Sequence, residues 1–127
     1  TQVSGEPPLL AISVDRAHRT HDLLSRSGVC ALNVVGARTR HLEDYFLSDA
    51  RRQADNLAAI AHAMHPAGVP VLSEVATALI CRVRDAHPAG DHTLFVVAVE
   101  EVVRREPDRP LTSLDLDYVY VGRVVRR

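Results

Sequence analysis

Two apolar segments rich in β-branched residues, 75–83 and 93–99, constrain the fold of this chain more than any other feature. The connector between them, 85–91, is rich in turn-forming residues, so the two segments are expected to pair as a long β-hairpin. The middles of both segments are apolar on both faces, and each face must therefore be covered. A closed barrel flanked by helices meets this requirement, and so does a sheet covered by a second copy of the chain.

Three further apolar runs are expected to form strands: 9–14, 29–35 and 118–124. Asn33 lies inside the second run. Because a buried amide without a partner costs stability, we expect the Asn33 side chain to be hydrogen-bonded. The polar segment 104–113 contains two prolines and is expected to be a loop.

Helical patterns separate these strands. A short helix is expected over 21–27, with Thr20 as its N-cap and Gly28 just past its end. A second helix is expected over 39–46. A third is expected to start at Ser48 and to run to residue 64, because apolar residues recur there at spacings of four and three. The predicted fold class is therefore mainly β with inserted helices, a small β-barrel formed by one domain over 1–127.

Charge and composition exclude several classes of protein. The net charge is −1 with no long block of like charge, which argues against a nucleic-acid partner. Charged residues interrupt every apolar run before the roughly 18 residues that a membrane span requires, so a soluble protein is expected. Cys30 and Cys81 show neither C-x-x-C spacing nor a Cys/His quartet. Two buried free thiols and a cytoplasmic location are the expectation.

Seven histidines are many for this length, and two pairs have a spacing of three residues. H-E-x-x-H is absent, and no carboxylate or thiol at a useful spacing completes either pair. We therefore expect surface histidines and no metal site. The chain also contains no G-x-S-x-G, G-x-G-x-x-G or P-loop pattern.

Two segments remain as candidates for a binding site. Segment 15–20 stands where a strand ends and a helix begins, and its arginines, hydroxyl and backbone N–H groups can form an anion site there. An ordinary capped helix with solvated arginines is the alternative interpretation. In segment 87–93, His92 can point into a barrel mouth and make one hydrogen bond, or it can be a turn residue without function.

Several motifs in order resemble those of the flavin reductase family. The chain has T-x-V-S-x-E-P-P-L at 1–9, V-D-R-x-x-R-T-H at 14–21, A-L-N-V at 31–34, G-V-P-V-L at 68–72 and P-A-G-D-H-T-L-F at 88–95. Each motif alone is weak evidence. Their common order along nearly the whole chain identifies it as similar to this family.

The resemblance implies an FMN-binding split barrel that uses NAD(P)H to reduce FMN or FAD without a metal, often to supply reduced flavin to a monooxygenase component. A homodimer is expected separately, because the strand faces are apolar and the chain has only five aromatic residues. The resemblance also implies roles for individual residues. Cofactor binding falls to the ring- and ribityl-contacting residues Thr1, Val3 and Ser4 and to the ribityl- and phosphate-contacting residues Arg16, His18, Arg19 and Thr20. His92 is implied as the catalytic-site residue, orienting the reactants where the nicotinamide approaches.

The chain also departs from the family pattern. His18 stands where the family usually has Ser, and Val97 where it usually has Gly. The family's first two strands precede Thr1 and are absent from this sequence, so we expect a domain that lacks its N-terminal strands. Two other functions stay open on these grounds: a non-catalytic split-barrel module that binds flavin or haem, and a structural dimer that has lost its site.

Overall fold

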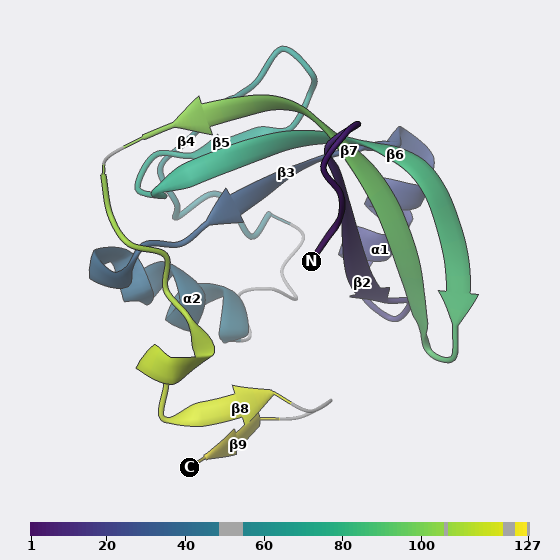
Figure 1. The fold of residues 1–127 in the computed structure, drawn as a ribbon. Coiled ribbons are helices and arrows are strands. Elements are labelled where there is room, and N and C mark those ends of the chain that lie inside the picture. The colour runs from purple at the N-terminus through teal and green to yellow at the C-terminus, as the bar shows by residue number, and fades with distance from the viewer. Residues whose placement is uncertain (49–54, 106, 121–123, 127) are drawn as a thin grey trace.

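The computed structural model describes residues 1–48, 55–105, 107–120 and 124–126, and Figure 1 shows their arrangement. Its centre is an antiparallel sheet with the strand order β1-β2-β7-β6-β3. These strands are β1 (Gln2–Ser4), β2 (Leu9–Asp15), β3 (Val29–Val34), β6 (Thr77–Ala89) and β7 (His92–Arg104). The mainly β fold with inserted helices is thereby confirmed.

Smaller elements surround this sheet. Two short hairpins pair β4 (His62–Met64) with β5 (Pro70–Leu72), and β8 (Tyr118–Tyr120) with β9 (Val124–Arg126). The helices are α1 (Arg19–Ser27) and α2 (Arg40–Leu47), and short 3₁₀ turns cover Ala37–Thr39 and Ser113–Asp115. In Figure 1 the long β6–β7 hairpin arches over the molecule, with α1 near one end of it and α2 below β3.

Both faces of the long hairpin are covered, as its two-sided apolar pattern requires. Ile80 belongs to one core cluster, which includes Leu42 of α2. Its neighbour Cys81 points to the opposite face and belongs to a second cluster with Leu24 of α1 and Phe95. Because successive side chains of a strand alternate between faces, the two helices cover opposite sides of one hairpin.

The hairpin is longer than the sequence pattern predicts. The expected turn-rich connector over 85–91 is wrong in most of its length, because β6 continues to Ala89 and only Gly90 and Asp91 form the turn. Gly90 has a φ of 61°, the left-handed conformation that a tight two-residue turn requires. Ladder hydrogen bonds to β7 extend the strand through polar residues that favour turns on local grounds.

Strand β2 and helix α1 follow the expected order. The expected strand over 9–14 is confirmed by β2, and Gly28 ends α1 with a φ of 68°. Thr20 as the N-cap is wrong: the cap is His18, and Thr20 lies in the first turn. The helix begins early because the Asp15 carboxylate accepts the N–H of Ala17, which tightens the turn directly before it.

The predicted helix from Ser48 to Met64 is wrong where the structure describes it. Residues 49–54 lie outside the described residues, 55–60 form turns and a bend, and β4 occupies His62–Met64. Pairing of β4 with β5 overrides the helical period of the apolar residues. The expected helix over 39–46 is confirmed by α2 within one residue at each end.

The expected strand over 118–124 is wrong as one continuous strand, because β8 ends at Tyr120 and β9 begins at Val124 and pairs back on it.

The expectation that the Asn33 side chain is hydrogen-bonded is confirmed. Its Oδ1 accepts the N–H of Leu72 at 2.9 Å and its Nδ2 donates to Pro70 O at 3.2 Å. Asn33 thereby holds β5 beside β3. Cys30 and Cys81 are free thiols opposite each other on β3 and β6, and Cys81 is fully buried.

Candidate functional site

The two candidate segments meet at one end of the central sheet. In the antiparallel register of β2 and β7, Asp15 lies directly opposite His92. The turn after β2 and the start of β7 are therefore neighbours, although 76 residues separate Arg16 from His92 along the chain. The Arg16 guanidinium donates to Gly90 O at 2.7 Å and to His92 O at 3.4 Å, and so fastens the turn to the hairpin tip.

A cavity of about 820 Å³ opens beside this junction. Its near wall contains His18, Thr20 and His92 from the predicted site, together with Asp15 at the end of β2. Its far wall comes from α2 and from residues 111–119. The cavity therefore joins the two candidate segments in one cleft of ligand size.

The N-terminus of α1 contributes His18 and Thr20 to the near wall. His18 caps the helix with an extended backbone and no side-chain hydrogen bond. The first turn of a helix has unpaired N–H groups and a positive dipole end, both of which favour a phosphate. No arginine is among the described residues that line the cavity. The His21 N–H already donates to His18 O at 2.9 Å, and the helix end contributes the polar residues His18 and Thr20 to the lining.

The remaining predicted site residues lie outside this lining. Arg16 is exposed and engaged with the hairpin tip, and Arg19 begins α1 on an exposed position. Thr1 joins the edge of β2 through two backbone hydrogen bonds with Ala11, each of 2.8 Å. Val3 and Ser4 follow on the edge strand β1, where Val3 is 53% exposed. Their roles stay predictions.

His92 is held by its neighbour at the start of β7. The Asp91 carboxylate lies 2.7 Å from the His92 Nδ1, and this contact lowers the pKa of Asp91 below its ordinary value. A carboxylate on Nδ1 fixes the orientation of the imidazole ring. His92 also lines the cavity.

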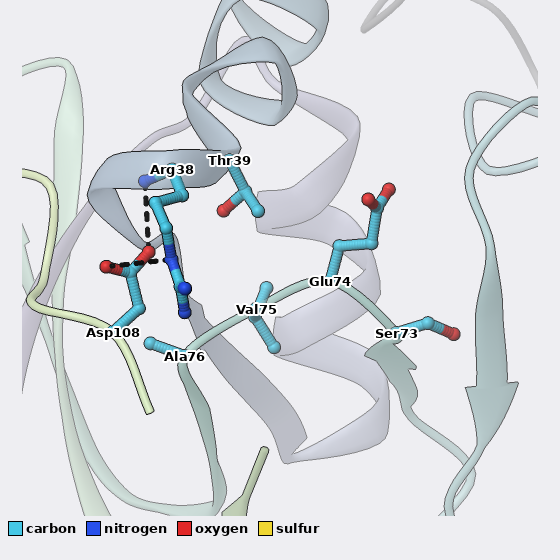
Figure 2. Close-up of a pocket in the computed structure, with 7 residues that line it drawn as sticks. All are labelled: Arg38, Thr39, Ser73, Glu74, Val75, Ala76 and Asp108. Atoms are coloured by element: carbon cyan, nitrogen blue, oxygen red, sulfur yellow. Dashed lines mark hydrogen bonds and ion pairs between the residues drawn. The ribbon is translucent and has the colours of Figure 1, made fainter. Parts of the chain in front are cut away.

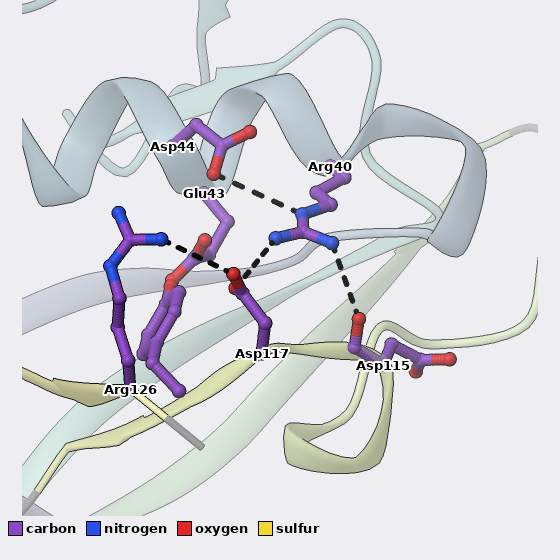
Figure 3. Close-up of polar contacts among 7 residues, drawn as sticks. Arg40, Glu43, Asp44, Asp115, Asp117 and Arg126 are labelled. Atoms are coloured by element: carbon purple, nitrogen blue, oxygen red, sulfur yellow. Dashed lines mark hydrogen bonds and ion pairs between the residues drawn. The ribbon is translucent and has the colours of Figure 1, made fainter.

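Helix α2 presents two adjoining faces, and one of them forms part of the far wall. Leu42 and Phe46 face the core, whereas Glu43 and Leu47, one position further on, line the cavity. The Glu43 carboxylate accepts a hydrogen bond from the hydroxyl of Tyr118 in β8. Figure 3 shows Glu43 projecting from α2 toward the segment that carries Asp117.

A network of charges attaches the far-wall segment to α2. Arg40 donates to Asp115 O at 3.3 Å and to the Asp117 carboxylate at 3.4 Å, and it lies 3.9 Å from the Asp44 carboxylate one turn further along α2. Arg126 reaches the same Asp117 from β9, as Figure 3 shows. These contacts explain how a polar segment keeps its place over the cavity.

Asp115 organises the far-wall loop itself. Its carboxylate takes a bidentate hydrogen bond from Arg109 at 2.6 and 2.9 Å, and further bonds from the N–H and hydroxyl of Thr112. These donors, Arg109 first, hold the pKa of Asp115 far below its ordinary value of 3.8. Asp115 is therefore ionised and paired with Arg109 at neutral pH. This ion pair positions Thr112 and Ser113 on the cavity wall.

The variant Asp115→Asn is expected to be less stable than the parent protein at pH 7, by an amount that shrinks in acid. A lowered pKa in the folded state stabilises the fold fully above the ordinary pKa, and this contribution is lost as the pH falls through the lowered value. Urea unfolding of both proteins from pH 7 to about pH 2 measures the difference. A constant difference across this range would contradict the assignment to the Asp115 charge.

A second, smaller cavity of about 290 Å³ lies between the 3₁₀ turn after β3 and the residues before β6 (Figure 2). Arg38 on the wall of this cavity is already paired with Asp108, whose carboxylate also accepts the Arg38 N–H at 3.0 Å.

Among the described residues no group of His, Cys, Asp and Glu is placed to hold a metal ion. No described helix is long and apolar enough to cross a membrane.

The far wall of the cavity was not predicted from the sequence. Glu43, Tyr118 and Thr112 belong to three segments that show no motif and are far apart along the chain. Their apolar companions in the far wall are Leu47, Leu111, Leu116 and Val119. The amphipathic pattern of α2 identifies its core face only, so no signal in the sequence marks these residues as neighbours.

Comparisons with known proteins agree on one protein family. The family described as "Flavin reductase like domain" matches residues 1–126. A curated relative, a probable flavin reductase of Rhizobium meliloti (strain 1021), is 30% identical over 85 residues, or 67% of this chain and 26% of the relative. The chain thus spans about a quarter of the length of that protein.

Solved structures agree on the fold. The NADH:FAD oxidoreductase of Streptomyces globisporus superposes with a TM-score of 0.77 at 23% identity, over 100% of this chain and 73% of that one. Component B of a nitrilotriacetate monooxygenase homologue from Mycobacterium thermoresistibile superposes with a TM-score of 0.75 at 26% identity, over 87% of this chain and 61% of that one. The split-barrel fold class expected from the motifs is thereby confirmed.

Proposed function

Because this chain belongs to the flavin reductase-like domain family, we propose that it is an NAD(P)H-dependent flavin reductase acting on FMN or FAD. The single observation that carries the proposal is the cavity of about 820 Å³ in which the α1 N-terminus and His92 face the same space. A phosphate-binding helix end beside an orienting histidine suits a nucleotide. NADH as the hydride donor is supported by the name of the oxidoreductase from Streptomyces globisporus.

The residues around the cavity fit a flavin nucleotide. The helix end offers N–H donors without a side-chain cap, which suit a phosphate. The lining also includes Val14, Val35, Leu47 and Leu111, which suit an aromatic ring system. A bound flavin would supply the redox chemistry, by accepting one hydride from the dihydronicotinamide to give reduced flavin and the oxidised nicotinamide.

The protein's own contribution is binding and orientation. The hydroxyl and backbone N–H of Thr20 would hold the phosphate together with His18, and Arg16 and Arg19 would add positive charge outside the lining. His92, fixed by Asp91, would position the reactants through its Nε2 without giving up a proton, because hydride transfer takes none from the protein. Thr1, Val3 and Ser4 are proposed to contact the ring and ribityl chain from β1.

We also propose a homodimer that passes reduced flavin to a monooxygenase component. Likeness to component B of the nitrilotriacetate monooxygenase homologue supports the oxygenase partner. Exposed apolar side chains on β1 and β7, such as Val3 and Val102, support the dimer. The free thiols of Cys30 and Cys81 suit a reducing compartment such as the cytoplasm.

The test is oxidation of NADH or NADPH by the purified protein with FMN or FAD added. We expect the dihydronicotinamide absorbance to fall only when both flavin and protein are present. Heat-denatured protein is the control for the spontaneous reaction between the two nucleotides. A protein that quenches FMN fluorescence but oxidises neither nicotinamide nucleotide would instead be a non-catalytic flavin-binding module.

A further inference from the structure

His21 in the first turn of α1 contacts the strand that carries His92. Its Nε2 lies 2.8 Å from the hydroxyl oxygen of Thr93, which directly follows His92 in β7. Its ring also packs against Phe95, and only 17% of its side chain is exposed. A polar ring that is largely buried needs a hydrogen-bond partner, and Thr93 supplies one. This contact joins α1 to β7 across 72 residues of chain.

The chemistry of this pair suits a lasting contact. A threonine hydroxyl can both donate and accept, and the imidazole Nε2 accepts when it is unprotonated and donates when it is protonated. The hydrogen bond between His21 and Thr93 is therefore possible in either protonation state of His21. The Asp22 carboxylate, which is 71% exposed, lies 3.8 Å from the His21 Nδ1, beyond hydrogen-bond distance. His21 is thus held through its Nε2.

The contact lies between the two parts of the near wall that the proposed function uses. His18, the N-cap of α1, and Thr20 in its first turn come shortly before His21 and line the cavity. His92, on the other side of the contact, lines the same cavity. His21 and Thr93 are not among the described residues that line it. Their hydrogen bond therefore sets the distance between two groups of cavity-lining residues without occupying the space of a ligand.

Arg16 anchors the same junction from the turn before the helix. Its guanidinium donates to Gly90 O at 2.7 Å and to His92 O at 3.4 Å. These bonds hold the backbone of the hairpin tip against the end of β2, whereas His21 holds the first turn of the helix itself. The loss of the His21 contact therefore leaves the junction anchored at Arg16, and a variant that lacks this contact is expected to fold.

We propose that His21 is a positioning residue, which through Thr93 sets the placement of the α1 end of the cavity relative to His92. This inference rests on the proposed function, because the placement matters for catalysis only if two nucleotides react in the cavity. Hydride transfer requires the reacting atoms in close and defined contact, and a displacement of about 1 Å can lower the rate on the order of a hundredfold. His21 holds the residues that bind the reactants and takes no part in the transfer itself.

Two single variants and their combination test this role. His21→Phe keeps a ring against Phe95 but removes the nitrogen, and Thr93→Val keeps the shape of threonine but removes the hydroxyl. Leu24→Val is the matched control, because Leu24 is buried in the core cluster under α1 and its shortening loosens the same helix without touching the hydrogen bond. The kcat is measured at saturating FMN and dihydronicotinamide, and urea unfolding measures stability.

Each single variant is expected to lower kcat by about tenfold, because the two groups of cavity-lining residues are then free to shift relative to each other. The double variant is expected to lose about tenfold as well, rather than about a hundredfold, because both changes break the same hydrogen bond. His21→Gln keeps a hydrogen-bonding side chain and should recover part of the lost rate. Leu24→Val is expected to lower the urea midpoint while its kcat stays within about twofold of the parent protein.

The proposal is overturned if folded His21→Phe keeps kcat within about twofold of the parent protein, or if the two single losses multiply in the double variant. An equal loss of kcat in Leu24→Val also overturns it, since a general loosening of α1 would then explain the effect. If His21→Phe does not fold, Thr93→Val decides in the same comparison with Leu24→Val. Failure of the proposed function gives a different result, because the parent protein itself then oxidises neither NADH nor NADPH with added flavin, which overturns the inference as well.

Discussion

The variant His18→Asp is expected to bind FMN about tenfold more weakly than the parent protein while its fold becomes more stable. Aspartate is a preferred N-cap residue, and α1 has no side-chain cap at present, so the helix should gain about 1 kcal/mol. The new carboxylate would occupy the N–H groups proposed for the phosphate, and it would repel that phosphate. Fluorescence titration with FMN and urea unfolding measure the two effects.

Two controls separate charge from capping. His18→Asn caps the helix about as well as aspartate but carries no charge, so it should lose less affinity for FMN. Riboflavin lacks the phosphate and should bind the parent protein and His18→Asp with similar affinity. If His18→Asp weakens riboflavin as much as FMN, the phosphate does not lie at the N-terminus of α1.

The variant Phe95→Ala is expected to lose about 3–5 kcal/mol of unfolding free energy, the cost of removing a buried aromatic ring. Phe95 is 2% exposed and packs with Leu24, Cys81 and Val97 in the core cluster between α1 and the hairpin. Its ring also contacts His21 of α1, with centroids 5.6 Å apart. The loss is a large share of the roughly 5–15 kcal/mol that stabilises a typical domain.

Leu94→Ala is the matched control for this effect. Leu94 adjoins Phe95 on β7 but points to the other face and is 38% exposed, so its truncation should cost less than about 1 kcal/mol. Urea unfolding of the two variants gives the comparison. Equal losses of unfolding free energy would show that the core cluster under α1 stabilises the fold no more than the exposed face of β7 does.

The local parts of the fold were accessible from the sequence because local interactions set them. Gly28 is the left-handed residue that ends α1, and the alternation of apolar residues around Ile80 and Cys81 requires cover on both faces. The position of the turn before α1 also follows from short-range chemistry, because a strand end and a helix start are both visible in segment 15–20.

Local rules failed where pairing between distant segments decided the conformation. His62–Met64 has a helical period but pairs with β5, and the polar end of β6 is a strand because β7 lies beside it. Hydrogen bonds of a ladder join residues far apart in the chain, so no short window of sequence contains them.

The sequence by itself determined which side chains are available to the site: the imidazoles of His18 and His92 and the hydroxyl of Thr20. Only the tertiary structure decided that they share a cavity, because the register of β2 against β7 places Asp15 opposite His92. It also decided the opposite wall, where α2 and β8 bring Glu43 to Tyr118 across 75 residues of chain. A cavity is a property of packed surfaces, and these surfaces exist only after distant segments have come together.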